Sequence, residues 1–197
     1  GGIHCSNSKL ILESVVLRDN MGGKGGAIHL DDAYLSMDSC TIESNVSSLT
    51  TNPGCLGGGI CCMNSDLILK NTDIINNSLN NNSTSTAHDD ALGGGIYASN
   101  SKLHLTNTNL CNNTTRTTKF SASGGGLYLN NSQAVIASST LKGNTSRSGG
   151  GGYILNSALY INEAVIEDNN ATSFGGRLYL DNCNPEFENV NILYNNA

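Results

Sequence analysis

The sequence predicts an all-β fold: a right-handed parallel β-helix (a solenoid) of about seven coils with three strands in each coil. The first observation behind this prediction is a unit that recurs seven times in 197 residues. Each unit begins with a cluster of glycine or other small residues, and the positions that close these clusters are Gly2, Ala27, Gly59, Gly95, Gly126, Gly151 and Arg177. Their spacing varies from 25 to 36 residues. A fixed unit with variable gaps is typical of a repeat protein built as a solenoid.

The second observation is that apolar residues recur at every other position in three short stretches of each unit. In the fourth unit, these stretches are centred on Tyr97, His104 and Asn109. This alternation is the period of a strand that turns one face inward. Parallel crossover connections are nearly always right-handed, so we expect right-handed coils around a narrow apolar core.

The third observation is a pair of asparagine columns. The first column contains Asn7, Asp32, Asn64, Asn100, Asn131, Asn156 and Asn182, and the second contains Asn20, Asn45, Asn77, Asn113, Asn144, Asn169 and Asn195. Asparagine tolerates left-handed backbone geometry, and its amide can bond to an identical amide one coil away. We therefore expect both columns to lie in turns and to form structural ladders.

Composition and charge argue against some classes of partner. With 13% charged and 5% aromatic residues, residues 1–197 read as a single elongated domain, which we expect to be an excerpt of a longer repeat protein. The net charge of −6 argues against nucleic acid as a partner, and no apolar run is long enough for direct membrane insertion. Abundant Asn-x-Ser/Thr sequons favour an extracellular or cell-surface glycoprotein, with Asn81 and Asn82 as the best acceptors.

The chain has seven cysteines, so at least one is free or pairs outside the chain. Cys5, Cys40 and Cys62 fall at inward positions, where we expect them to act as small apolar core residues. Cys55 and Cys61 are close enough in sequence to form a disulfide, and the sequence leaves open whether they do.

Two features point to binding surfaces. Nearly all length variation follows the second asparagine column, so loops 46–56, 78–92 and 114–123 should form one display ridge, or else merely shield the rod. An outward column contains Tyr97, Tyr128, Tyr153 and Tyr179. These rings should stack as a ladder, or offer an aromatic strip to a sugar or a partner.

We expect no catalytic activity, no cofactor and no metal. Glycoside hydrolysis needs two carboxyl groups within about 5–10 Å. The outward acids of the second stretch, which include Glu13 and Asp38, are expected to be spread along the rod rather than paired, and no acid is expected beside the tyrosines. His88, Asp89 and Asp90 could ligate a metal, but adjacent residues of this kind in a loop are more often solvated.

The repeat resembles that of the polymorphic outer-membrane proteins, the chlamydial adhesin type within the pectin-lyase-like parallel β-helix group. Two stretches show the resemblance: residues 25–28 (Gly-Gly-Ala-Ile) followed by 42–45 (Ile-Glu-Ser-Asn), and residues 57–60 (Gly-Gly-Gly-Ile) followed by 74–77 (Ile-Ile-Asn-Asn). The resemblance implies an ectodomain that adheres or builds extracellular structure, and it transfers no catalytic residues.

The predicted function is therefore an adhesin or a structural and assembly module at the cell surface. Its partners would be neighbouring copies, other surface proteins or glycans. Two alternatives remain open at this point: a filament subunit that stacks end to end, and a module that binds or cleaves polysaccharides.

Overall fold

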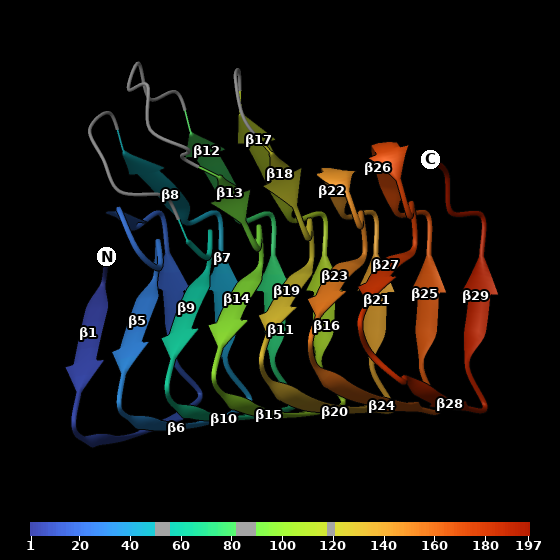
Figure 1. The fold of residues 1–197 in the computed structure, drawn as a ribbon. Helices are drawn as coiled ribbons and strands as arrows, with labels where there is room; N and C mark the ends of the chain where they lie inside the picture. Colours follow the sequence, from blue (N-terminus) through green and yellow to red (C-terminus); the bar gives the residue numbers. More distant parts are fainter. Residues whose placement is uncertain (50–55, 82–89, 118–120) are drawn as a thin grey trace.

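The computed structural model describes residues 1–49, 56–81, 90–117 and 121–197, and these form a parallel β-helix. Seven coils stack along one axis, with the two ends of the chain at opposite ends of the stack (Figure 1). Three sheets of seven parallel strands enclose the core, each strand pairing with its counterpart in the next coil. The predicted fold class is confirmed.

The strands of these three sheets follow the predicted stretches closely. The first sheet contains β1 (Ile3–Ser6), β5 (Ile28–Asp31), β9 (Ile60–Met63), β14 (Ile96–Ser99), β19 (Leu127–Asn130), β23 (Gly152–Leu155) and β27 (Leu178–Asp181). The second contains β2 (Lys9–Glu13), β6 (Tyr34–Asp38), β10 (Asp66–Lys70), β15 (Lys102–Thr106), β20 (Gln133–Ala137), β24 (Ala158–Asn162) and β28 (Glu186–Glu188). The third contains β3 (Val16–Arg18), β7 (Thr41–Glu43), β11 (Asp73–Ile75), β16 (Asn109–Cys111), β21 (Thr140–Lys142), β25 (Val165–Glu167) and β29 (Asn191–Leu193).

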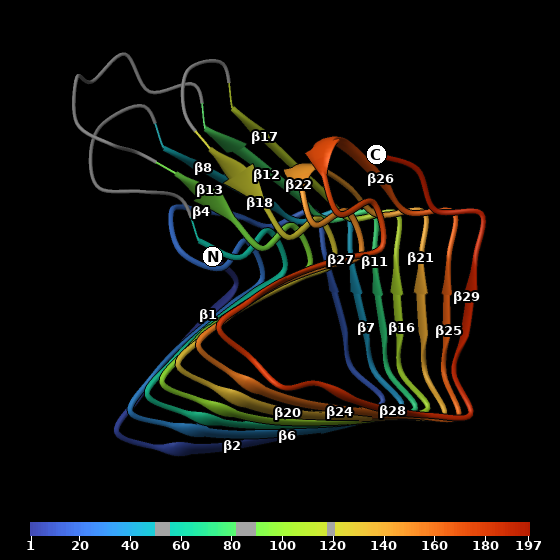
Figure 2. The ribbon, with the colours of Figure 1, turned by 45° about the vertical axis from the view of Figure 1, so that its right-hand side comes forward.

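The core is a narrow column inside the triangular cross-section seen nearly end-on in Figure 2. Inward side chains stack like on like, as Leu67 does on Leu103, because the sheets are parallel and in register. Leu69 and Ile74 are fully buried there. Burying a side chain of this kind contributes roughly 1.5–3 kcal/mol, and truncating one to alanine in such a thin core costs about 2–5 kcal/mol.

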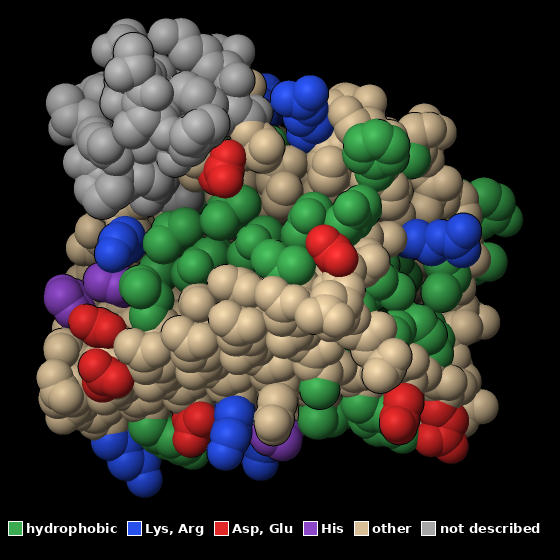
Figure 3. Space-filling model, in the orientation of Figure 1, with side chains coloured by type: hydrophobic (Ala, Val, Ile, Leu, Met, Phe, Trp, Pro, Cys, Tyr) green, Lys and Arg blue, Asp and Glu red, His purple; other side chains and the backbone are tan. Residues whose placement is uncertain are grey.

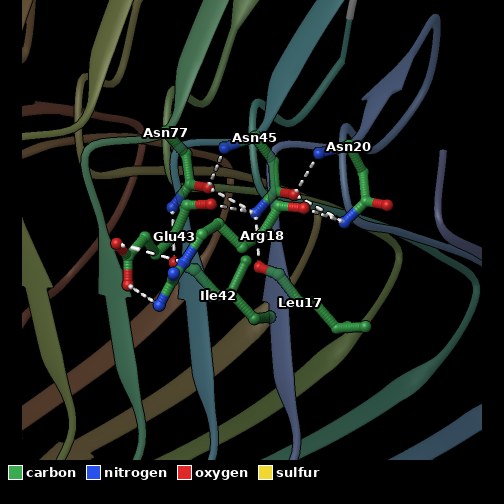
Figure 4. Close-up of polar contacts among 7 residues, drawn as sticks. All are labelled: Leu17, Arg18, Asn20, Ile42, Glu43, Asn45 and Asn77. Atoms are coloured by element: carbon green, nitrogen blue, oxygen red, sulfur yellow. Dashed lines mark hydrogen bonds and ion pairs between the residues drawn. The ribbon is translucent and has the colours of Figure 1, made fainter.

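The second asparagine column forms a buried ladder that runs through all seven coils. The Asn45 side-chain nitrogen Nδ2 and backbone N–H both donate to Oδ1 of Asn77, at 2.9 and 3.0 Å (Figure 4). Asn77 donates in the same way to Asn113, and the pattern continues to Asn195. Nδ2 of Asn45 also donates to the Leu17 carbonyl, so each amide holds turns of neighbouring coils together. The prediction for this column is confirmed.

The first asparagine column has a different role. Its members have positive φ, such as 48° at Asn64, and they are exposed. Amide bonds between neighbours occur only from Asn100 to Asn64 and from Asn182 to Asn156 in the described chain. The column therefore supplies left-handed turn residues, and the expectation of a continuous ladder holds only in part.

A serine ladder, which was not predicted from the sequence, forms the hydrogen bonds between coils at the turn of the first asparagine column. The residue after each asparagine is often serine, and its hydroxyl accepts from the backbone of the neighbouring coil. The N–H of Ser65 donates to Oγ of Ser101 at 3.1 Å, and the N–H of Ser101 donates to Oγ of Ser132 at 3.1 Å. Each hydroxyl thus satisfies a buried backbone donor that would otherwise cost about 1–3 kcal/mol.

A fourth sheet, which the sequence did not predict, stands beside the three-sided body. Its strands are β4 (Met21–Gly22), β8 (Val46–Leu49), β12 (Ser78–Asn81), β13 (Ala91–Leu92), β17 (Thr114–Thr117), β18 (Ala122–Ser123), β22 (Thr145–Ser148) and β26 (Asn170–Phe174). Strands β8, β12 and β17 leave the body side by side in parallel register, and β13 and β18 return beside each other. Figure 2 shows this sheet projecting past the triangle.

The described parts of loops 46–56, 78–92 and 114–123 lie in or next to this sheet. Outgoing and returning strands pack on each other through a small apolar cluster of Leu79, Ala91 and Ala122. Residues 50–55, 82–89 and 118–120 lie outside the described residues. The bases of the three insertions are therefore neighbours on one side of the rod, as a common ridge requires.

Candidate functional site

The second positions of the first-sheet strands form one outward file of side chains. From β1 to β27 it reads His4, His29, Cys61, Tyr97, Tyr128, Tyr153 and Tyr179. The tyrosine ring centroids are 5.5, 5.3 and 4.5 Å apart in chain order, with interplanar angles of 10°, 14° and 15°. The predicted stacking of the four rings is therefore present.

Stacking decides which part of each tyrosine a ligand can reach. Parallel stacked rings attract each other by about 0.5–1.5 kcal/mol per pair, and they cover each other's faces. Tyr128 and Tyr153 each have a ring on both sides, so they can present only edges and hydroxyls. The file therefore offers a row of phenol groups about one strand spacing apart, not a flat strip of ring faces.

A second file, which we call the cover row, lies next to the tyrosines at the end of the returning fourth-sheet segments. It consists of Lys24, Leu56, Leu92, Ser123, Ser148 and Phe174, each paired with the next. Leu56 and Leu92 pack on a buried cluster that contains Cys61, Tyr97 and Tyr128. Beyond Leu92 the cover row changes from leucine to serine.

Exposure of the tyrosines increases along the file. Tyr97 is 8% exposed and Tyr128 is 7% exposed, whereas Tyr153 and Tyr179 are only half-buried. Tyr97 and Tyr128 are therefore not available as an aromatic strip, because the fourth sheet covers them. Burial raises the pKa of Tyr97, Tyr128 and Tyr153. These phenols are neutral at pH 7 and can each donate and accept a hydrogen bond.

A hollow of about 390 Å³, which we call the tyrosine groove, lies beside the last three tyrosines of the file, with Tyr128 at its covered end. One wall is formed by Tyr128, Tyr153 and Tyr179, and the other includes Ser123, Ser148 and Phe174. Figure 3 shows hydrophobic side chains as a band along this face of the molecule. Phe174 is 65% exposed at the rim. A volume of this size lies at the lower end of the range of ligand sites.

Two side chains of opposite charge also line the groove. Oδ1 of Asp90 accepts from the Ser121 N–H at 3.3 Å, and Nε of Arg147 donates to Oγ of Ser173 at 3.4 Å. Neither Asp90 nor Arg147 forms an ion pair within the described residues. Asp90 corrects the expectation that no acid lies beside the tyrosines. The groove thus combines one acceptor carboxylate, one donor guanidinium and several hydroxyls.

The acids of the second sheet also differ from the expectation. Glu13 and Asp38 are direct partners in β2 and β6, so they are paired across neighbouring coils, and Lys70 is the next partner. Asp38 accepts hydrogen bonds from Nδ2 of Asn71 at 2.9 Å and from Oγ of Ser39 at 3.0 Å, and these bonds lower its pKa. The absence of catalysis stays a prediction.

The predicted modification sites are placed only in part. Cys61 is fully buried with a raised pKa caused mainly by desolvation, and Cys55 lies outside the described residues, so their disulfide remains a prediction. Asn81 in β12 is 2% exposed, which leaves its amide little access to a glycosylating enzyme. Asn82 also lies outside the described residues.

Among the described residues, no group of three or more His, Cys, Asp and Glu side chains is placed to hold a metal ion. His88 and Asp89 lie outside the described residues. No helix long and apolar enough to cross a membrane occurs among the described residues.

Comparison with models of known protein families, with curated proteins and with solved structures finds no match to this chain. The stacked parallel sheets agree with a β-helix, but no relative supports the narrower resemblance to the polymorphic outer-membrane proteins.

Proposed function

We propose that the protein is a non-catalytic recognition module of an extracellular or cell-surface repeat protein, acting as an adhesin. The observation that carries this proposal is the tyrosine groove, a hollow lined by phenols, hydroxyls and two charged side chains that form no ion pair with the described residues. The fourth sheet, from which the three insertions extend, supplies one of its walls. The insertions and the groove therefore share one side of the rod, where a single partner can contact both.

Two sequence features support the same role. The repeat resembles that of surface adhesins, and the chain is rich in Asn-x-Ser/Thr sequons, as extracellular glycoproteins often are. Rigid scaffolds that carry loops on one side are a common arrangement for binding proteins. The resemblance to the polymorphic outer-membrane proteins enters only as part of this proposal.

Adhesion of protein-coated beads to cultured cells and to extracellular matrix tests the proposal. We expect the native protein to retain beads, and deletion of residues 83–89 to reduce retention while the melting temperature changes little. Deletion of the core strand β20 (Gln133–Ala137) is the control for unfolding. Retention no greater than that of uncoated beads would reject the recognition role.

A second candidate function, end-to-end stacking, is favoured by the asparagine ladder. An inner rung of the ladder, such as Asn77, accepts from the amide of the previous coil and donates to the amide oxygen of the next coil. Two copies placed end to end would continue the same bonding. Light scattering over a range of concentrations tests stacking, since stacked copies increase the mass whereas a constant monomer mass excludes them.

A further inference from the structure

The tyrosine groove has a shape and a polarity that restrict its ligand. Its tyrosine wall, formed by Tyr128, Tyr153 and Tyr179, extends along the rod over ring spacings of 5.3 and 4.5 Å. Ser123 and Ser148 of the fourth sheet also line the groove. The groove therefore offers rows of groups that both donate and accept hydrogen bonds, repeated once in each coil.

Most of the backbone of both walls is already paired. Tyr153 lies in a strand paired on both sides, and Ser123 and Ser148 lie in paired strands of the fourth sheet, whereas Tyr179 and Phe174 lie in β27 and β26, the last strands of their sheets. An extended peptide that adds to a sheet needs free backbone groups along an edge. The side chains of the groove are thus the groups available to a ligand, and most of those described are hydroxyls.

The charges of the groove favour a neutral ligand. Asp90 accepts and Arg147 donates, and neither is neutralised by an ion pair in the described structure. An acidic ligand would be attracted by Arg147 but repelled by Asp90. A basic ligand would be attracted by Asp90 but repelled by Arg147. Alcohol groups satisfy both residues, because a hydroxyl can donate to the carboxylate and accept from the guanidinium.

We propose that the tyrosine groove binds a short, unbranched, neutral oligosaccharide that lies along the rod axis. Its hydroxyls bond to Tyr153, Tyr179 and Ser148, while Asp90 and Arg147 fix its orientation. Phe174 at the rim packs against the apolar face of a sugar ring. This inference rests on the proposed recognition role and names its ligand class.

The test is calorimetric titration of the whole chain with neutral and uronic-acid oligosaccharides of several linkages. We expect at least one neutral oligosaccharide to bind, with affinity reduced roughly 3- to 10-fold by Tyr153→Phe and by Tyr179→Phe, as expected for one lost hydrogen bond. These variants keep the ring stack and remove only the hydroxyl. The matched control is Tyr97→Phe, in the same file but covered, which should bind as the native protein does.

Three results would overturn the proposal: no binding of any neutral oligosaccharide, equal weakening by Tyr97→Phe, or binding of acidic sugars alone. Bead adhesion provides the separate readout for the recognition role. Adhesion that persists without saccharide binding would reject only the ligand class, whereas loss of both would reject the recognition role as well.

Discussion

The tyrosine file has a covered half and an open half that are built from the same residue type. Tyr97 and Tyr128 lie under Leu92 and neighbouring atoms of the fourth sheet, whereas Tyr153 and Tyr179 lie beside Ser148 and an exposed Phe174. Strand register and ring stacking are the same in both halves. The packing of the fourth sheet over the file, close at Tyr97 and Tyr128 and open at Tyr153 and Tyr179, therefore separates the tyrosines of the core from those of the site.

This difference separates stability from recognition within one column of residues. A covered tyrosine contributes by burial and by stacking, and its hydroxyl is largely removed from solvent. An open tyrosine contributes less to stability by burial, and its hydroxyl stays accessible to a ligand. The same substitution made in the two halves should consequently have different effects, which makes the comparison testable.

The largest expected effect is on stability. Tyr128→Ala removes a buried ring that is stacked on both sides, so we expect it to lower the free energy of unfolding by about 3–5 kcal/mol. Tyr179→Ala removes a half-buried ring with one described stacking partner, and we expect a loss below about 1.5 kcal/mol. Urea denaturation measures both. Equal losses would show that the two halves do not differ in burial.

The next effect is on binding. Ser148→Leu would place a leucine in the cover row beside Tyr153, since Ser148 and Tyr153 line the same groove. We expect oligosaccharide affinity to fall by about 10-fold or more, while stability stays the same or rises by about 1 kcal/mol from the added apolar burial. Thr140→Leu on the third sheet is the control for an added leucine elsewhere. Unchanged affinity in Ser148→Leu would place the ligand outside the groove.

The smallest effect is confined to alkaline pH. Burial holds the pKa of Tyr97 and Tyr128 above the value of about 10 found in an unfolded chain. Their contribution to stability is complete below that pH and is lost as the pH rises towards the higher folded-state values, because ionisation then favours the unfolded chain. Tyr128→Phe should show a shallower loss of stability above pH 10, measured by denaturation at several pH values. Tyr194→Phe, at an 83% exposed residue, should follow the native protein.

Much of the fold could be predicted because each coil repeats the same local chemistry. The alternating stretches gave the three sheets, and the invariant second asparagine column gave the buried ladder that includes Asn113 and Asn144. The first column looked equivalent in sequence, but its backbone is left-handed and its side chains face solvent. Sequence alone did not separate these roles, because both uses of asparagine occur at turns.

The site was less predictable because it depends on contacts between segments that the repeat does not align. The fourth sheet forms where insertions interrupt the repeat, so the pairing of Leu56 with Leu92 is not evident from periodicity. The sequence nevertheless contains a signal for the cover row. Every member of the row from Lys24 onward lies three positions before the end of a glycine cluster. The register of the repeat also predicts that Glu13 pairs with Asp38, so the expectation that these acids are spread along the rod was wrong.

Nitration of tyrosines with tetranitromethane, located by mass spectrometry, tests the account most directly, because it reads the covered and open halves in one sample. Tyr194 is 83% exposed and serves as the positive control. We predict that Tyr153 and Tyr179 are nitrated, that Tyr97 and Tyr128 are protected, and that the bound oligosaccharide protects Tyr153 and Tyr179 without affecting Tyr194. Equal nitration of all four tyrosines in the file, or no protection of Tyr153 and Tyr179 by the ligand, would contradict the account.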